Sequence, residues 1–200
     1  MTVHRVGLMG GTFDPIHNAH LFIAEDARIR FVLDTVLFIP NGSPPHKSGR
    51  EVASAHHRLE MTKLAVASNP MFRTSEIEMR ADAPSYAVDT LRGIRSQFPD
   101  SEILYITGTD TVAELMTWKA PEEVIALAQF AAYSRPGCSP EQLQNALPAN
   151  YLSRVHILES INLEISSTDI RQRLSAHKPV RYLIPDAVLE YIEHNDLYVR

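Results

Sequence analysis

Short apolar, β-branched runs alternate along this chain with longer segments of helical composition. The first run, 6–9, stops at Gly10-Gly11, and the second, 35–39, stops at Pro40-Asn41-Gly42, which are turn signals. Parallel strands must be joined by long crossovers, usually helices. The alternation therefore constrains the chain to an α/β fold with a single doubly wound, mainly parallel sheet.

Apolar patterning places the individual elements. Strands are expected at 6–9, 35–39, 74–79, 103–106, 130–133 and 155–158. Helices are expected at 18–31, 54–68, 87–97, 122–127 and 186–194, with a further one begun by Ser167-Thr168-Asp169. The polar, proline-flanked stretch 136–150 is expected to be an irregular surface excursion. No second boundary is visible, so residues 1–200 are predicted to form one domain with a helical C-terminal portion.

The charge balance narrows the classes of partner. Nineteen Lys and Arg against 24 Asp and Glu leave a net charge of −5. Coating of nucleic acid or of an anionic membrane needs clustered positive charge, so neither is expected. No apolar run reaches the ~18 residues of a membrane span, the first residues lack the apolar stretch of a signal peptide, and the single cysteine, Cys138, cannot pair internally. These features predict a cytoplasmic protein and leave a homo-oligomer open.

The stretch Gly-Gly-Thr-Phe-Asp-Pro-Ile-His-Asn-Ala-His, residues 10–20, follows the first predicted strand. Paired glycines allow a tight turn with bare amides close to a ligand, and a helix start offers unpaired N–H groups at the positive end of its dipole. His17 and His20 share one face of the first helical turn because they are three residues apart. The combination predicts a polyphosphate site. Taken alone, the two glycines are consistent with a simple turn. The two histidines alone are consistent with a metal site, but no Cys, Asp or Glu completes an evident ligand set.

A second stretch, Ile-Ser-Ser-Thr-Asp-Ile-Arg at 165–171, begins a predicted helix. Its plainest interpretation is a helix cap made by Ser167 or Thr168. Arg171, however, comes one helical turn after both hydroxyls, so a guanidinium, hydroxyls and amides could converge on one phosphate.

Together the two stretches resemble the HxGH and ISSTxxR signatures of a nucleotidyltransferase superfamily with a Rossmann-like fold. Within it, the chain is most similar to the bacterial nicotinate-nucleotide adenylyltransferase family, from residue 4 to 199. The shorter phosphopantetheine adenylyltransferases lack the intermediate segments that carry this similarity. These segments are Ile39-Pro40-Asn41, Pro44-Pro45-His46-Lys47, Pro84-Ser85-Tyr86, Asp89-Thr90-Leu91, Gly108-Thr109-Asp110, Trp118, Arg135-Pro136-Gly137 and Tyr182-Leu183-Ile184-Pro185.

The resemblance implies transfer of AMP from ATP to nicotinate mononucleotide, which gives deamido-NAD and pyrophosphate in NAD biosynthesis. The mononucleotide phosphate attacks the α-phosphorus of ATP directly, so catalysis depends on positioning and charge stabilisation rather than on an enzyme nucleophile. Mg²⁺ is expected to be held by the ATP phosphates, without a dedicated protein metal site.

The same resemblance implies three sets of site residues. The catalytic set is His17, His20 and Arg171, with His20 at the transferred α-phosphoryl group and Arg171 at the β- or γ-phosphate. The ATP-binding set contains the catalytic residues and Gly10, Gly11, Thr12, Phe13, Gly108, Asp110, Ser167 and Thr168. The mononucleotide-binding set is Lys47, Tyr86, Trp118 and Arg135. On the sequence alone, Trp118 fits an apolar anchor as well as it fits a platform for the pyridine ring.

Two residues depart from the family pattern. Ala19 replaces the glycine of HxGH, which is harmless where the backbone is helical. Ala87 replaces a threonine expected near the pyridine carboxylate, so preference for the amidated mononucleotide, or use of both, stays an alternative. A nucleotide-binding sensor without activity is a further alternative, although both histidines and Arg171 are retained. A nucleic-acid-binding module is the least favoured because no basic, aromatic-rich stripe is present.

Overall fold

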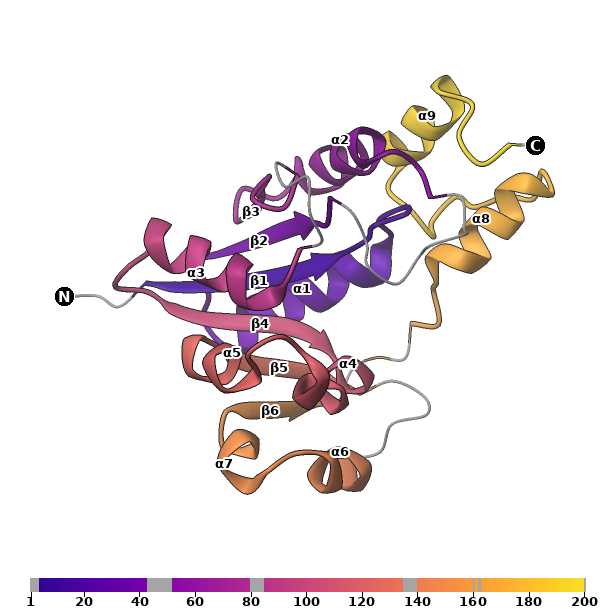
Figure 1. Ribbon diagram of the computed structural model, residues 1–200. Helices are drawn as coiled ribbons and strands as arrows, with labels where there is room; N and C mark the ends of the chain where they lie inside the picture. The colour runs from indigo at the N-terminus through magenta and orange to yellow at the C-terminus, as the bar shows by residue number, and fades with distance from the viewer. Residues whose placement is uncertain are drawn as a thin grey trace.

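A computed structural model describes residues 4–42, 52–79, 85–134, 140–159, 161 and 163–199. Its centre is a six-stranded sheet in the order β3-β2-β1-β4-β5-β6, in which every neighbouring pair is parallel (Figure 1). The strands are β1 (Arg5–Gly11), β2 (Thr35–Pro40), β3 (Phe72–Thr74), β4 (Glu102–Gly108), β5 (Gln129–Tyr133) and β6 (Val155–Leu158). The predicted α/β class with a parallel sheet is confirmed.

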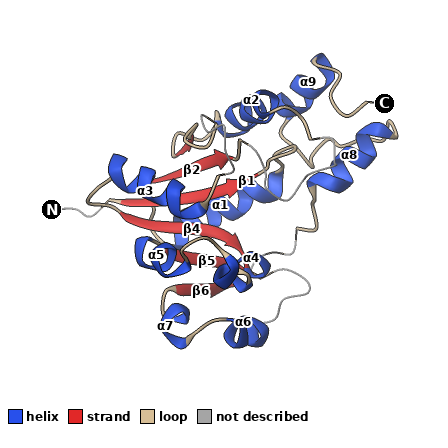
Figure 2. Ribbon diagram, viewed as in Figure 1, coloured by secondary structure: helices blue, strands red, loops and turns tan. Residues whose placement is uncertain are grey.

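Helices lie on both faces of this sheet (Figure 2). They are α1 (Asn18–Arg30), α2 (Ala55–Val66), α3 (Ala87–Gln97), α4 (Thr109–Ala113), α5 (Pro121–Leu127), α6 (Pro140–Ala146), α7 (Ala149–Leu152), α8 (Ser167–Ser175) and α9 (Asp186–His194), with a 3₁₀ turn η1 (Leu115–Thr117). Within the part of the chain that the structure describes, none of these helices has the length and apolar character needed to cross a membrane.

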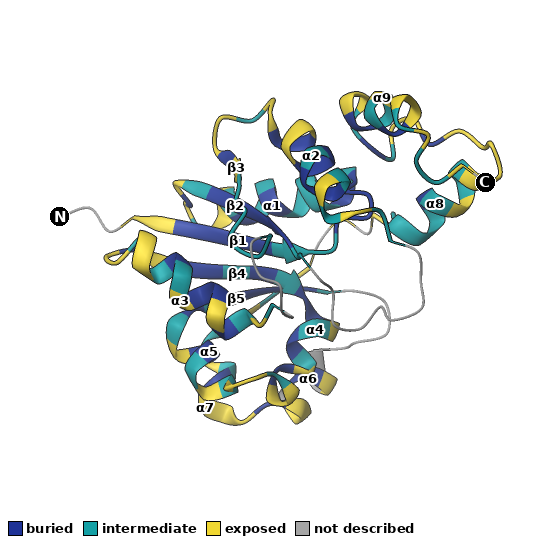
Figure 3. Cartoon of the chain, turned by 45° about the horizontal axis from the view of Figure 1, so that its top comes forward, coloured by how far each residue is buried: buried dark blue, intermediate teal, exposed yellow. Residues whose placement is uncertain are grey.

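Alternation along the strands builds two separate cores. In β2, Val36 and Phe38 face a core completed by α1, α2, α8 and α9, whereas Leu37 and Ile39 face a core completed by α3 to α7. Both faces of a doubly wound sheet are covered in this way, which explains why β2 reads as a continuous apolar run. Figure 3 shows the buried strands between these more exposed helices.

The strand order places a topological switch point between β1 and β4. From β1 the chain continues through β2 to β3 on one side, and β4, β5 and β6 extend the sheet on the other. Open parallel sheets bind ligands in the crevice outside the carboxyl ends of the strands at such a point. The residues that follow β1 and β4 are therefore the first place to look for a site.

Several predicted boundaries were wrong, each for a local reason. The strand expected at 74–79 is β3 at Phe72–Thr74, because the chain then turns and Ile77 packs against Gly93 of α3 instead of extending the sheet. Gly10 and Gly11 continue β1 and pair with Ile39 and Pro40 instead of ending the strand.

The described part of the predicted surface excursion is helical. Residues 140–152 contain α6 and α7, and Leu143, Leu147 and Tyr151 are buried in the core beneath α3 to α7. Their four-residue spacing is a helical period, although the polar residues between them hide it. The short α4 and η1, after β4, were also missed.

Candidate active site

The connection from β1 to α1 lies at the switch point and turns sharply. A Cβ on Gly10 would come within 2.8 Å of the Tyr105 hydroxyl, and one on Gly11 within 2.9 Å of the Phe13 ring, so a larger residue at either position would force an aromatic side chain to move. Phe13 has a φ of 48° and is buried beneath the loop. Its ring meets the His20 ring edge-on at a centroid distance of 5.1 Å. Gly10 and Gly11 are partly exposed, so their backbone remains accessible above this packed base.

His17 and His20 come together at the start of α1, as predicted from their spacing. His17 is the N-cap residue, and the two rings stack with centroids 3.7 Å apart and planes 21° apart. The backbone N–H of His17 donates to Nδ1 of His20 at 3.2 Å. A neutral His20 ring that accepts at Nδ1 carries its proton on Nε2, where it can donate to an anionic oxygen. His17 is buried, whereas His20 is partly exposed.

Replacement of the family glycine by Ala19 was predicted to be harmless if the backbone is helical, and the backbone is helical there. Ala19 lies within α1 and is buried at 4% exposure. The helix accommodates its methyl group, so the difference from the family glycine does not disturb the histidine pair.

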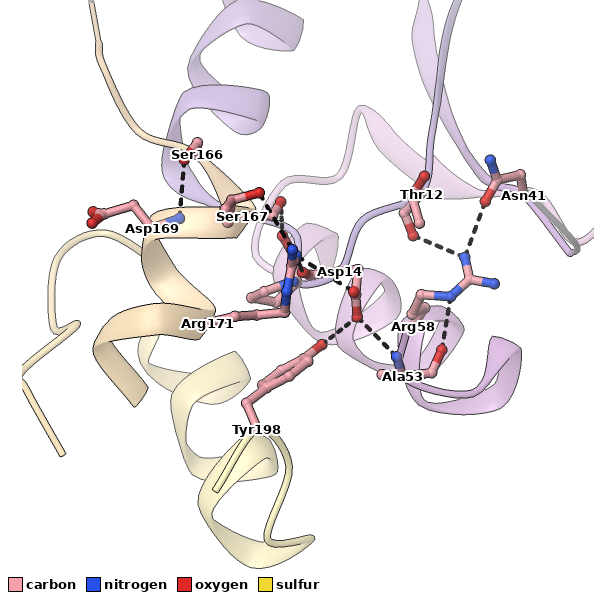
Figure 4. A network of polar contacts seen from close by, with 12 residues as sticks. Thr12, Asp14, Asn41, Ala53, Arg58, Ser166, Ser167, Asp169, Arg171 and Tyr198 are labelled. Carbon is pink, nitrogen blue, oxygen red and sulfur yellow. Dashed lines mark hydrogen bonds and ion pairs between the residues drawn. The ribbon is translucent and has the colours of Figure 1, made fainter. Parts of the chain in front are cut away.

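The second sequence stretch lies directly against this loop (Figure 4). The Ser167 hydroxyl donates to the Pro15 carbonyl at 2.9 Å, and Arg171 donates to the Asp14 carbonyl and to Thr168 Oγ1. These contacts bring together residues that are more than 150 positions apart in the chain. One expectation was wrong: Ser166, rather than Ser167 or Thr168, caps α8, by accepting from the Asp169 N–H at 3.1 Å. Because Ser166 makes the cap, the Ser167 hydroxyl is used to join the two stretches.

Three residues that sequence reasoning did not select complete this region. Arg58 of α2 is 1% exposed, and its guanidinium donates to the carbonyls of Thr12, Gly42 and Ala53 and to Asn41 Oδ1. Asp14, also 1% exposed, accepts from the Ala53 N–H and the Tyr198 hydroxyl. Arg58 lies on the buried face of α2 together with Met61 and Ala65. A charged residue among such apolar positions indicates that its side chain is buried in a polar network. Tyr198 gave no such signal.

Burial sets the protonation of this region. Burial lowers the pKa of Arg58, while the negative charge of Asp14 opposes that shift. Burial also raises the pKa of Tyr198, and the neighbouring Asp14 carboxylate adds to the effect. Tyr198 is therefore a neutral hydrogen-bond donor at ordinary pH.

The residues after β4 form the other wall of the switch point. Gly108 ends β4 and is the N-cap of α4, Thr109 is fully buried, and Asp110 is exposed in the first turn of α4. Gly108 and Asp110 thus occupy the strand-end location expected for them. Their contacts with adenosine stay a prediction.

The residues expected at the mononucleotide are more exposed. Tyr86 is the N-cap of α3, is 42% exposed, and has the Lys119 ammonium 4.4 Å from its ring centroid. Trp118 is half-buried, edge-on to Tyr105 at 6.1 Å and to Phe130 at 6.4 Å. These contacts give Trp118 the apolar anchorage that the sequence allowed, and its stacking on a pyridine ring stays a prediction. Lys47 and Arg135 lie outside the described residues.

Comparison with known proteins places this geometry in a family. The model of the cytidylyltransferase-like family matches residues 8–173. A probable nicotinate-nucleotide adenylyltransferase of Desulfitobacterium hafniense is 45% identical over 197 residues, covering 97% of this chain and 95% of that protein. One from a Nocardioides species is 46% identical over 192 residues, covering 96% and 93%.

Solved structures agree at the level of the fold. A nicotinic acid mononucleotide adenylyltransferase of Plasmodium falciparum, solved in complex with NaAD, superposes with a TM-score of 0.80 over 98% of this chain and 97% of that chain. The identity is 18%.

Proposed function

Because this chain belongs to the nicotinate-nucleotide adenylyltransferases of the cytidylyltransferase-like family, we infer that it transfers AMP from ATP to nicotinate mononucleotide in NAD biosynthesis. The products are NaAD and pyrophosphate. The observation that carries this function is the junction of the two signature stretches. His17 and His20 stack at the start of α1. Arg171 reaches from α8 to the Asp14 carbonyl in the loop before α1, and it also donates to Thr168 on its own helix.

The reaction is an in-line displacement at phosphorus. An oxygen of the mononucleotide phosphate forms a bond to the α-phosphorus of ATP, and the bond from that phosphorus to the oxygen bridging to the β-phosphorus breaks. Pyrophosphate leaves with the bonding electron pair. No covalent enzyme intermediate is required, so the chain contributes alignment and stabilisation of charge.

Each end of the triphosphate has a matching group. We assign the Nε2–H of His20 to the non-bridging oxygens of the α-phosphoryl group, where negative charge grows, with His17 beside it on the phosphate chain. Arg171 is assigned to the β- or γ-phosphate, because a guanidinium matches phosphate geometry and neutralises the leaving pyrophosphate. The N–H groups at the start of α1 add fixed positive dipole at the same place.

Mg²⁺ is proposed as the substrate-bound metal. Among the residues that the structure describes, no group of three or more His, Cys, Asp or Glu side chains could hold a metal ion. ATP phosphates are the expected ligands, since Mg²⁺ commonly binds through substrate phosphates and water. When bound, it would offset phosphate charge and fix the triphosphate conformation.

Selectivity for the acid is assigned to the start of α3. Ala87 is the first residue of this helix, and Tyr86 makes no side-chain cap there. A helix start without a side-chain cap presents backbone N–H groups that can accept a carboxylate, whereas a carboxamide brings a donor of its own. Loss of the threonine hydroxyl at Ala87 therefore leaves a backbone means of discrimination. Because Ala87 lacks the hydroxyl of the family threonine, use of both mononucleotides remains the second candidate function.

Pyrophosphate release by the purified protein tests this function. ATP and Mg²⁺ are supplied with nicotinate mononucleotide or with nicotinamide mononucleotide, and kcat/KM is compared. We expect the acid to be preferred by more than ~100-fold, or about 2.7 kcal/mol. Comparable rates would show dual specificity, and absence of release with either substrate would favour the nucleotide-binding sensor.

A further inference from the structure

The segment after α9 returns to the β1–α1 connection through one hydrogen bond. The Tyr198 hydroxyl donates to Asp14 Oδ1 at 2.7 Å, across 184 positions of sequence. Tyr198 has a φ of 64°, in the left-handed region that non-glycine residues seldom occupy. Figure 4 shows the phenol pointing from this segment toward Asp14, with Arg171 on the carboxylate's other side.

The two carboxylate oxygens of Asp14 have different surroundings: Oδ1 accepts hydrogen bonds, whereas Oδ2 makes only an ion-pair contact. Oδ1 accepts from the Tyr198 hydroxyl and, at 3.1 Å, from the Ala53 N–H. Oδ2 lies 3.4 Å from Nη1 of Arg171, whose side chain is 13% exposed. Two donors on Oδ1 fix the plane of the carboxylate and direct Oδ2 at the guanidinium. Nη1 of Arg171 also donates to the main-chain carbonyl of Asp14. The carboxylate adds an ion pair to that contact, and its orientation sets the geometry of the ion pair.

Arg171 faces open space as well as Asp14. Arg171, Thr168 and Tyr198 help to line a cavity of about 630 Å³ between α8 and the segment after α9. Nη2 of Arg171 donates to Thr168 Oγ1 at 3.3 Å. The guanidinium is therefore held at Asp14 and Thr168 while its side chain keeps access to an anion.

We propose that Tyr198 is a positioning residue for the adenylyl transfer: its hydroxyl orients Asp14, and Asp14 holds Arg171 ready for the ATP phosphates. This inference rests on the proposed function, in which Arg171 binds the β- or γ-phosphate. The phenol does not touch substrate and acts through the carboxylate. Because the phenol is neutral, it donates to Asp14 without adding charge to a region that already holds two guanidinium groups and one carboxylate.

Removal of the Tyr198 hydroxyl alone tests this role. Tyr198→Phe keeps the packing of the ring and deletes the bond to Asp14. We expect the KM for ATP to rise ~10-fold, the scale of one lost hydrogen bond to a charged group, with the KM for nicotinate mononucleotide unchanged. A solely structural role would lower the unfolding temperature and would leave the ratio of the two KM values unchanged.

Tyr191→Phe is the matched control. The Tyr191 hydroxyl bonds to Nδ1 of His57 at 2.9 Å and so ties α9 to α2, without reaching Asp14. This variant should leave both KM values at wild-type levels. An equal rise in ATP KM for both variants would overturn the proposal, because it would show a general effect of loosening α9.

Asp14→Asn gives a second variant that separates charge from shape. Asparagine keeps an oxygen for the Tyr198 hydroxyl and the Ala53 N–H, but it removes the negative charge that faces Arg171. We expect the same selective rise in ATP KM. A wild-type ATP KM in folded Asp14→Asn, with folding followed by circular dichroism, would overturn the proposal even where Tyr198→Phe is unstable.

A double-variant cycle with Arg171→Lys tests whether the effect passes through Arg171. Lysine cannot reproduce the paired contacts of the guanidinium, so Arg171→Lys should raise the KM for ATP by itself, and adding Tyr198→Phe should then have little further effect. Full additivity would overturn the positioning role and leave the proposed function intact. A wild-type ATP KM in Arg171→Lys would instead refute the assignment of Arg171 to the phosphates, and with it both inferences.

Discussion

The two walls of the switch point are built differently. On the phosphate side, Asp14, His17 and Arg58 are buried at 1%, 6% and 1% exposure, and Arg58 donates to three backbone carbonyls. On the proposed mononucleotide side, Tyr86 is 42% exposed and Lys119 is held by a surface ion pair with Asp89.

The difference follows from what each wall has to do. Charge develops at phosphorus during the reaction, so groups that are fixed before substrate arrives avoid a reorganisation cost in the transition state. A flat pyridine ring needs a surface of suitable shape, and exposed ion pairs contribute little to stability. Replacement of a residue should therefore be costly on the phosphate side and tolerated on the other. Four variants measure this contrast.

His20→Ala should give the largest loss. Removal of a positioned donor at the transferred phosphoryl group is expected to lower kcat by roughly 10²–10⁴-fold, with little change in unfolding temperature. Steady-state pyrophosphate release measures the effect. His56→Ala, at an exposed position on α2, serves as the control and should retain wild-type turnover. Near-normal turnover of folded His20→Ala would exclude this ring from the chemistry.

Arg58→Met tests the rigidity of the phosphate wall through stability. The variant leaves the carbonyls of Thr12, Gly42 and Ala53 without their buried donor, so we expect a loss of about 3–5 kcal/mol in unfolding free energy. Urea denaturation measures this loss. Arg73→Met, at an exposed position of β3, should stay within ~0.5 kcal/mol of wild type. Equal losses in both variants would remove the contrast between buried and exposed arginines.

Trp118→Leu tests the opposite wall with a smaller expected effect. Loss of an aromatic platform worth about 0.5–1.5 kcal/mol should raise the KM for the mononucleotide roughly 2- to 12-fold and leave that for ATP unchanged. Phe98→Leu, which packs against the same core from the end of α3, controls for lost packing. An equal rise in both KM values would show that Trp118 is a structural anchor and would extend the rigid region to this wall.

Glu78→Gln should give the smallest change. Burial raises the pKa of Glu78, although the Thr90 hydroxyl, which donates at 2.6 Å, partly opposes the shift. A raised folded-state pKa means that ionisation costs stability as the pH rises above the usual glutamate value. The variant should therefore raise the unfolding temperature at pH 7.5 and less so at pH 4.5. Exposed Glu122→Gln should show no such pH dependence, and the opposite trend in Glu78→Gln would contradict burial as the cause.

Local patterns made much of the fold predictable. The alternation of apolar runs and helices predicted the strands at 35–39, 103–106 and 130–133 with small shifts in their bounds. The strand at 155–158 and the helices at 87–97 and 186–194 were predicted without any shift. Strand β3 was misplaced because it is a three-residue strand at the edge of the described sheet, so few apolar residues mark it. The helices within 140–152 were missed because polar residues separate the apolar residues that reach the core, such as Leu143, Leu147 and Tyr151.

The candidate site was predictable where a motif is contiguous. The spacing of His17 and His20 was enough to place both rings on one helical turn, and the turn from Ser167 to Arg171 was enough to predict a cluster of polar groups. The partners of that cluster were not predictable. Asp14 accepts from the hydroxyl of Tyr198, which is 184 positions away, and no local pattern encodes that approach.

The central place of β1 in the sheet also bears on how the chain folds. Its neighbours are β2, about 30 positions along the sequence, and β4, with Arg5 aligned to Glu102. Closing the longer loop costs more chain entropy before any contact is gained, so pairing of β1 with β4 is the slower event. Since the switch point lies between these two strands, refolding chains should regain catalysis with the long-range pairing, after the local β1-α1-β2 unit has formed.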